Sequence, residues 1–162
     1  MDNALLMKKD RMRFVKNKTS ANLAYLAIIF NVLYFISIYS SDPGNHYYSI
    51  KIGVSVIYNL LFLLTVFLAS EGLKNYKISY AVIITVVGIL QIVRIFGYPM
   101  EGAKTVLESG ERVMETKQVV YTVTMLALSA ASAIASGVIG IVRTEILEKY
   151  KASLPKEVNM PH

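Results

Sequence analysis

The chain has 162 residues, of which 54% are hydrophobic and 17% are charged, and its formal net charge is +6. A soluble domain carries roughly 25% charged residues, and here the charges gather in short stretches between long apolar runs. The basic residues flank these runs and form no patch among aromatic side chains, which argues against nucleic acid as a partner. The absence of cysteine excludes disulfides, thiolate metal sites and cysteine nucleophiles.

Residues 1–20 form a basic N-terminal segment with few acidic residues. We interpret it as a cytoplasmic segment near the inner membrane surface, where each basic residue contributes about 1 kcal/mol of attraction to anionic lipid. The simplest interpretation is that it only sets the orientation of the first span. Its six cations are Lys8, Lys9, Arg11, Arg13, Lys16 and Lys18.

Two apolar runs follow, at about 21–40 and 52–69. Each matches the roughly 20 residues that an α-helix needs to cross the hydrocarbon of a bilayer. The first run is too long for a signal-peptide core and lacks an Ala-x-Ala site after it, so we expect it to be retained. The turn-rich sequence SDPGNHYYS between the two runs predicts an antiparallel hairpin.

The third and fourth runs lie at about 78–98 and 119–142. The outer loop between them, 99–118, is the longest and most charged connection. An apolar stripe at helical spacing, Val106 with Val113 and Met114, predicts one or two short helices there, broken near Ser109-Gly110. The loop is either a lid, a docking surface or a solvated connector, and we favour the connector.

The distribution of Lys and Arg sets the orientation. Twelve lie before the first span, between the second and third, or after the fourth, and four lie on the opposite side. Cytoplasmic loops are enriched in these residues, so both termini are expected in the cytoplasm, including the C-terminal tail 143–162, whose first part should continue the fourth helix. The fold class is therefore an all-α integral membrane protein of the cell membrane. Its domain at 21–142 is an up-down-up-down bundle of four transmembrane helices.

One charged residue, Arg94, lies inside a predicted span. Gln91, Arg94 and Tyr98 are spaced to share one helix face, so they suggest a polar path or an anion contact. An ionisable residue within a span is a functional hypothesis by default. Because Arg94 is near the predicted outer end of its span, it can also reach water or pair with Glu101. We favour this structural interpretation.

Asn31 and Asn59 are the other central polar groups, in the first and second spans. Such amides usually bond between helices, and each bond contributes about 0.6 kcal/mol on average. Since both lie near the middle of their spans, they could face each other.

The fourth span carries a signal for close helix packing. Two rows of small residues recur at intervals of four, which lets another helix approach closely. One row can pack within the chain, and the other can bind a second copy or another membrane protein. The first row is Ser129, Ala133 and Gly137, and the second is Ser132, Ser136 and Gly140.

The sequence offers no catalytic group, metal site or cofactor motif. The only histidines are His46 and His162, which do not form a zinc-type pair. No span contains Asp or Glu, which argues against a proton relay, and phosphate-binding and nucleophile motifs are missing. A membrane enzyme is therefore the least supported class.

The leading hypothesis is a non-enzymatic accessory or structural subunit of a larger membrane complex, such as a transport complex. Its partners would be the lipid bilayer and a membrane protein, or a second copy, bound through span four. The alternative is a small oligomeric transporter or channel. Its polar path would use Gln91, Arg94, Asn31 and Asn59.

Overall fold

The computed structural model describes residues 3–38, 46–106, 110 and 112–154, and the side chains of Asn3, 46–49 and Ile52 lie outside this description. The described part is helical apart from short connections. Four of its helical segments are long and apolar enough to cross a membrane, which confirms the four predicted spans. The helices are α1 (Asn3–Arg11), α2 (Lys18–Ile38), α3 (His46–Lys74), α4 (Ile78–Ile95), α5 (Tyr98–Lys104) and α6 (Thr116–Ala152).

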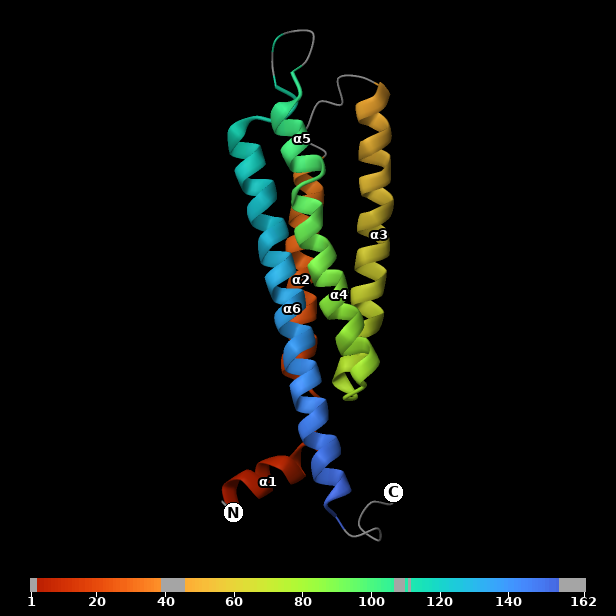
Figure 1. The fold of residues 1–162 in the computed structure, drawn as a ribbon, viewed down its shortest axis with the longest axis vertical. Coiled ribbons are helices and arrows are strands. Elements are labelled where there is room, and N and C mark those ends of the chain that lie inside the picture. Colours follow the sequence, from red (N-terminus) through yellow and green to blue (C-terminus); the bar gives the residue numbers. More distant parts are fainter. Residues whose placement is uncertain (1–2, 39–45, 107–109, 111, 155–162) are drawn as a thin grey trace.

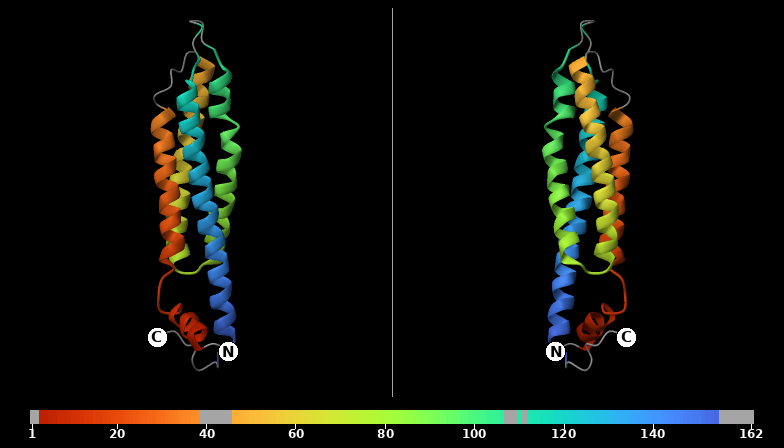
Figure 2. Two further views of the ribbon diagram at one scale, coloured as in Figure 1. Left: turned by 90° about the vertical axis from the view of Figure 1, so that its left-hand side faces the viewer. Right: turned by 90° about the vertical axis from the view of Figure 1, so that its right-hand side faces the viewer.

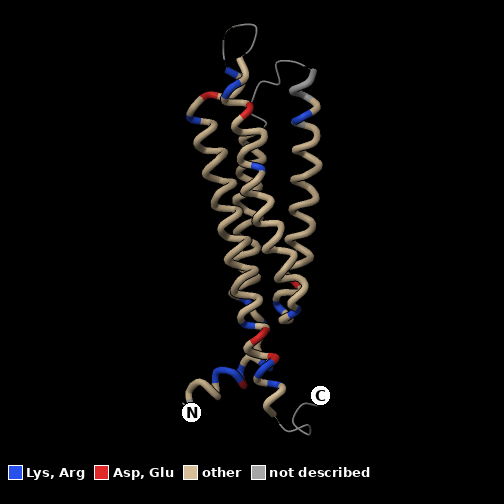
Figure 3. Tube along the Cα trace, in the orientation of Figure 1, with Lys and Arg blue, Asp and Glu red and all other residues tan. Residues whose placement is uncertain are grey.

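The long helices form an elongated bundle, and the short helix α1 lies across one end of it (Figures 1 and 2). Helix α6 packs along α4 and α2, whereas α3 packs against α2 and α4. Charged residues gather at the two ends of the bundle, and the long middle section is almost free of them (Figure 3). This arrangement suits a bundle whose middle section is surrounded by hydrocarbon.

Hydrogen bonds show which helix ends lie together. At one end, the backbone N–H of Asn17 donates to Lys74 O at 3.0 Å, and Arg143 Nη1 donates to the side-chain oxygen Asn17 Oδ1 at 2.8 Å. These bonds bring together the start of α2, the end of α3 and the second half of α6. At the other end, Gln118 near the start of α6 donates to Ser37 O near the end of α2, at 2.7 Å.

Two buried apolar clusters lie along the bundle. One is nearer the Asn17 end and the other is nearer the Gln118 end. In α2 and α6 the residues between the two clusters include buried polar side chains. The first cluster includes Ala24, Ala27, Val66, Leu73, Ala81, Ile84 and Ala133, and the second consists of Tyr34, Ile38, Tyr98, Val113, Met114 and Leu126.

The small residues of α6 face into the bundle, and all six members of the two predicted rows are buried. A Cβ atom built on Gly137 would lie 2.7 Å from Ala81 O, so α6 and α4 approach each other closely there. Hydroxyl groups of the rows also bond to the backbone of α2: Ser136 Oγ donates to Ser20 O at 2.7 Å. Both rows are therefore used inside the chain, and a partner would need another surface.

The connection from α4 to α6 differs from the predicted helical stripe. Helix α5 is the one helix in its described part, and it ends at Lys104. Val106 then forms an isolated antiparallel bridge with Arg112, and the Val113 N–H donates to Thr105 O at 3.0 Å. Val113 and Met114 are buried because the chain folds back onto α5, so the helical interpretation of their spacing is wrong.

Helix bounds also differ in places from the predicted spans. Helix α3 begins at His46, well before the predicted start of its span, and α4 ends at Ile95, so Tyr98 belongs to α5. Helix α6 continues to Ala152, as expected for the first part of the tail. The predicted Asp42–Asn45 turn, Ser109 and His162 lie outside the described residues.

Candidate functional site

A cluster of polar side chains lies between the two apolar clusters, with contributions from all four long helices. We call it the polar centre. In this centre, Gln91 and Arg94 of the third span form hydrogen bonds with residues of each of the other three spans. Its members are Asn31 of α2, Ser55 of α3, Gln91 and Arg94 of α4, and Ser129 of α6.

The Arg94 guanidinium is the hub of this centre. Its Nη2 donates to Ser55 Oγ at 2.8 Å and is 3.4 Å from Ser55 O. Its Nη1 is 3.3 Å from Asn31 Oδ1 and 3.4 Å from Gln91 Oε1. The planar fork of an arginine can serve several acceptors at once, and here it connects α4 to α2 and α3. Arg94 also lies in the last turn of α4, where the helix dipole favours a positive charge.

Two tyrosine rings lie close to this guanidinium. Its central carbon is 4.4 Å from the ring centroid of Tyr34 and 4.6 Å from that of Tyr58. Both distances are within the range in which a cation is attracted to the negative face of an aromatic ring. The rings therefore replace part of the hydration that the charge loses inside the bundle.

No carboxylate within the described ranges forms an ion pair with Arg94. Glu101, one of the outer partners considered for Arg94, pairs with Lys51. Arg94 bonds to the buried Asn31 and Ser55 and not to Glu101. Its positive charge is held by neutral oxygens and aromatic rings.

A second set of bonds extends the centre from α4 to α2 and α6. Gln91 Nε2 donates to Asn31 Oδ1 at 2.8 Å and is 3.4 Å from Ser129 Oγ. Ser129 in turn donates to Ala27 O at 2.9 Å. Asn31, Gln91 and Ser129 are completely buried, so these bonds are shielded from competing water.

Several buried polar atoms next to the centre have no hydrogen-bond partner in the described part of the chain. They are Asn31 Nδ2, Tyr34 Oη and both amide atoms of Asn59. Asn59 is one helical turn from Ser55 along α3 and is 1% exposed. Asn31 and Asn59, which could face each other by their depth in the spans, form no hydrogen bond with each other, because Asn31 bonds to α4. Orphaned groups of this kind call for a water molecule or a ligand group.

Sequence reasoning named Gln91, Arg94, Asn31 and Asn59 but missed Ser55, Ser129 as part of the centre, and both tyrosines. Ser55 carries a usable signal, since it is four residues from Asn59 and so shares a helix face with it. Tyr34 and Tyr58 carry no comparable signal, because aromatic residues are frequent at many depths of these spans.

The described residues contain no group of three His, Asp or Glu side chains that could hold a metal ion. Fold and centre together define a class: an all-helical, multi-pass membrane protein with an arginine that is solvated by neutral groups between its spans. No known protein family, curated protein or solved structure matches this chain.

Proposed function

We propose that the chain crosses the cell membrane four times in an up-down-up-down bundle, with both termini in the cytoplasm and α5 on the outer side. The support is the excess of Lys and Arg at the end that holds α1, the α3–α4 turn and the end of α6. Cytoplasmic loops carry such an excess.

We further propose that this protein is a non-enzymatic accessory or structural subunit of a larger membrane complex for transport. The observation that supports this proposal is that the Arg94 guanidinium forms its hydrogen bonds inside the bundle. Both terminal nitrogens donate to acceptors from the chain itself, on α2, α3 and α4. Such a hub holds helices in register, which is the main use of polar residues between membrane helices.

The surface for a partner would be the outward face of α3 and α4, since the small rows of α6 are already covered. The span that includes α4 is the least buried of the four, with 22% of its window inside the bundle. Its outward residues are large and apolar, so either lipid or another membrane helix can cover them. They include Val82, Val86, Ile89 and Val93 of α4, and Val54, Ile57, Leu61 and Leu64 of α3.

Photo-crosslinking in the native membrane tests this proposal. A photoreactive amino acid at Val86, which is half exposed, should crosslink to one defined protein, and that protein should co-purify in mild detergent. The same group at Ile84, which is completely buried, should react only within the chain. If Val86 crosslinks only to lipid and the extracted protein is a lone monomer, the subunit proposal is lost.

A second candidate is a small oligomeric transporter or channel with a polar path through Gln91, Arg94, Asn31 and Asn59. It is favoured by the absence of an ion-pair partner for Arg94 in the described part, and by the unpartnered Asn59 amide. Proteoliposomes with chloride or acetate as probes would show flux that Arg94→Ala abolishes without loss of insertion. Equal flux with and without Arg94 would remove this candidate.

A further inference from the structure

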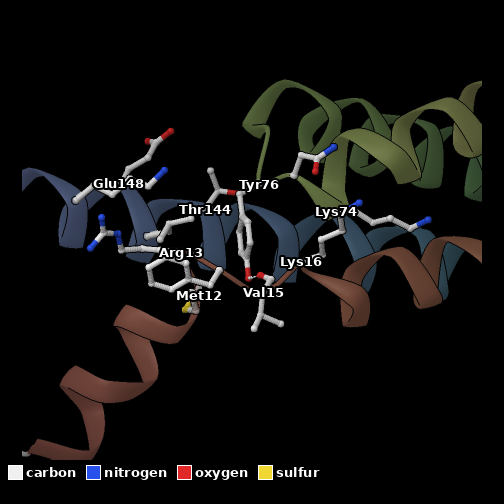
Figure 4. Close-up of a pocket in the computed structure, with 12 residues that line it drawn as sticks. Met12, Arg13, Val15, Lys16, Lys74, Tyr76, Thr144 and Glu148 are labelled. Carbon is white, nitrogen blue, oxygen red and sulfur yellow. Dashed lines mark hydrogen bonds between the residues drawn. The ribbon is translucent and has the colours of Figure 1, made fainter. Parts of the chain in front are cut away.

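A second polar site lies at the end of the bundle that holds α1. A cavity of about 260 Å³ opens between the α1–α2 connection, the α3–α4 turn and the last turns of α6 (Figure 4). Segments that are distant in the sequence form its walls, and most of their charged side chains are basic. We call it the basic cavity, and the residues used in the argument are Arg13, Lys16, Lys74, Tyr76, Glu148 and Lys151.

The walls of the cavity are joined by hydrogen bonds. The Tyr76 hydroxyl donates to Val15 O at 3.1 Å, and the Asn17 backbone N–H donates to Lys74 O at 3.0 Å. Burial raises the pKa of the Tyr76 hydroxyl, so this donor stays protonated at neutral pH. Tyr76 has φ at +55°, a left-handed conformation that is uncommon for a non-glycine residue. This conformation occurs in the turn between α3 and α4, and the Tyr76 ring lies among the other side chains that line the basic cavity (Figure 4).

The charges of the cavity are unbalanced. Among the described residues that line it, four are cations and one, Glu148, is an acid. Arg13 pairs with Asp10, and Lys74 pairs with Glu71. Arg143, which bonds to Asn17 beside the cavity, adds one positive charge.

We propose that the basic cavity binds a phosphate group. Lys and Arg are the usual partners of phosphate oxygens, and basic pockets at the cytoplasmic ends of membrane helices bind phospholipid headgroups. The volume is slightly below the range of drug-sized pockets, which suits one headgroup or a small soluble phosphate compound. The site is separate from the polar centre, and its position beside the α3–α4 turn puts it level with lipid headgroups if the four spans cross a bilayer.

The test compares two charge-matched variants of the full chain in detergent. Arg13→Gln with Lys16→Gln removes two cations from the cavity, whereas Lys8→Gln with Lys149→Gln removes two cations from the same end that do not line it. Because Lys16 is exposed, the single variant Lys16→Gln should fold even if the double variant does not, and it then serves as the cavity variant. The unfolding temperature of each protein is measured in two titrations. The first compares phosphatidylglycerol with phosphatidylcholine. The second compares sodium phosphate with sodium chloride of equal ionic strength.

We expect phosphatidylglycerol to raise the unfolding temperature of the unaltered chain and of the Lys8/Lys149 variant. The cavity variant should need at least about tenfold more lipid for the same rise in unfolding temperature. Each basic residue contributes about 1 kcal/mol of attraction to anionic lipid, and about 1.4 kcal/mol corresponds to a tenfold change in affinity. If sodium phosphate raises the unfolding temperature and phosphatidylglycerol does not, the ligand is a soluble phosphate compound. If neither titrant separates the cavity variant from its matched control, the phosphate site does not exist.

Discussion

At the scale of single residues, the main feature is a charge that the chain keeps without an ion-pair partner in the described part. Insertion scales put the cost of an arginine at the centre of a spanning helix at about 2.5–3.5 kcal/mol. Four acceptor contacts and two tyrosine rings surround the Arg94 guanidinium. These contacts offset the cost of burial, so the residue can link helices.

Replacement of Arg94 by alanine should lower the free energy of unfolding by roughly 2 kcal/mol, because four bonds of about 0.6 kcal/mol each are lost. Arg94→Lys should give a similar loss, since an ammonium group keeps the charge but cannot span Asn31 and Ser55 as a fork. The measurement is an SDS titration of the purified chain. If the lysine variant is as stable as the unaltered chain, charge alone is needed and the linking role is wrong.

The two central asparagines should respond differently to the same substitution. Asn31→Leu removes the acceptor of Gln91 and Arg94, so it should destabilise the bundle by about 1–3 kcal/mol. Asn59→Leu replaces an amide that has no partner among the described residues, so it should be neutral or stabilising. The same SDS titration compares them. A loss at Asn59 as large as that at Asn31 would mean that a bound water or ligand satisfies the Asn59 amide.

At the scale of helices, the close approach of α6 to α4 depends on glycine. A Cβ on Gly137 would meet backbone atoms of α4 at 2.7 Å from Ala81 O and 3.0 Å from Thr85 N. Gly88 of α4 is similarly confined, since a Cβ there would lie 2.8 Å from Ile134 Cγ1 of α6. Backbone cannot move aside as a flexible side chain can, so the separation of the two helices must increase when a methyl group is added at Gly137.

Gly137→Ala should therefore destabilise the bundle by about 1–3 kcal/mol, the usual cost of overpacking a core. Gly53→Ala is the matched control, because a Cβ at Gly53 of α3 meets nothing within 4 Å. Alanine is the better helix former, so the control should be neutral or slightly stabilising. Thermal unfolding in detergent distinguishes the two. Equal stability of both variants would contradict the close packing of α4 and α6.

At the scale of the whole molecule, the proposed orientation can be tested directly because the chain contains no cysteine. Thr116 and Ser153 are exposed near opposite ends of the bundle, at the two ends of α6. In intact cells, a membrane-impermeant maleimide should label Thr116→Cys but should label Ser153→Cys only after permeabilisation. The reverse pattern would invert the proposed topology, and labelling of both without permeabilisation would mean that α6 does not cross the membrane.

The four spans were predictable because run length decides the matter: a long apolar segment must satisfy its backbone internally, as a helix does. The helix ends were less predictable, since α3 starts before its apolar run and includes the polar Lys51. The connection after α5 was mispredicted, because the spacing of Val106, Val113 and Met114 also fits a chain that folds back on itself.

The candidate site was predictable only in part. Polar residues within apolar spans stand out in a sequence, which is how Asn31, Gln91 and Arg94 were found. Their partners depend on how each helix is rotated about its axis. These spans are apolar on nearly all sides, so no polar face fixes that rotation. The sequence therefore could not show that Asn31 faces Gln91 and not Asn59, or that both small rows of α6 face inward.

The polar centre also has a consequence for how the chain is made. Each of the groups that surrounds the Arg94 guanidinium, namely Asn31, Tyr34, Ser55, Tyr58 and Gln91, precedes it in the sequence. During synthesis, the first two spans therefore emerge from the ribosome before the arginine does. The charge can be accommodated as soon as the third span enters the bilayer, without waiting for the fourth span. Ser129, which arrives last, bonds to Gln91 and completes the centre when α6 packs into the bundle.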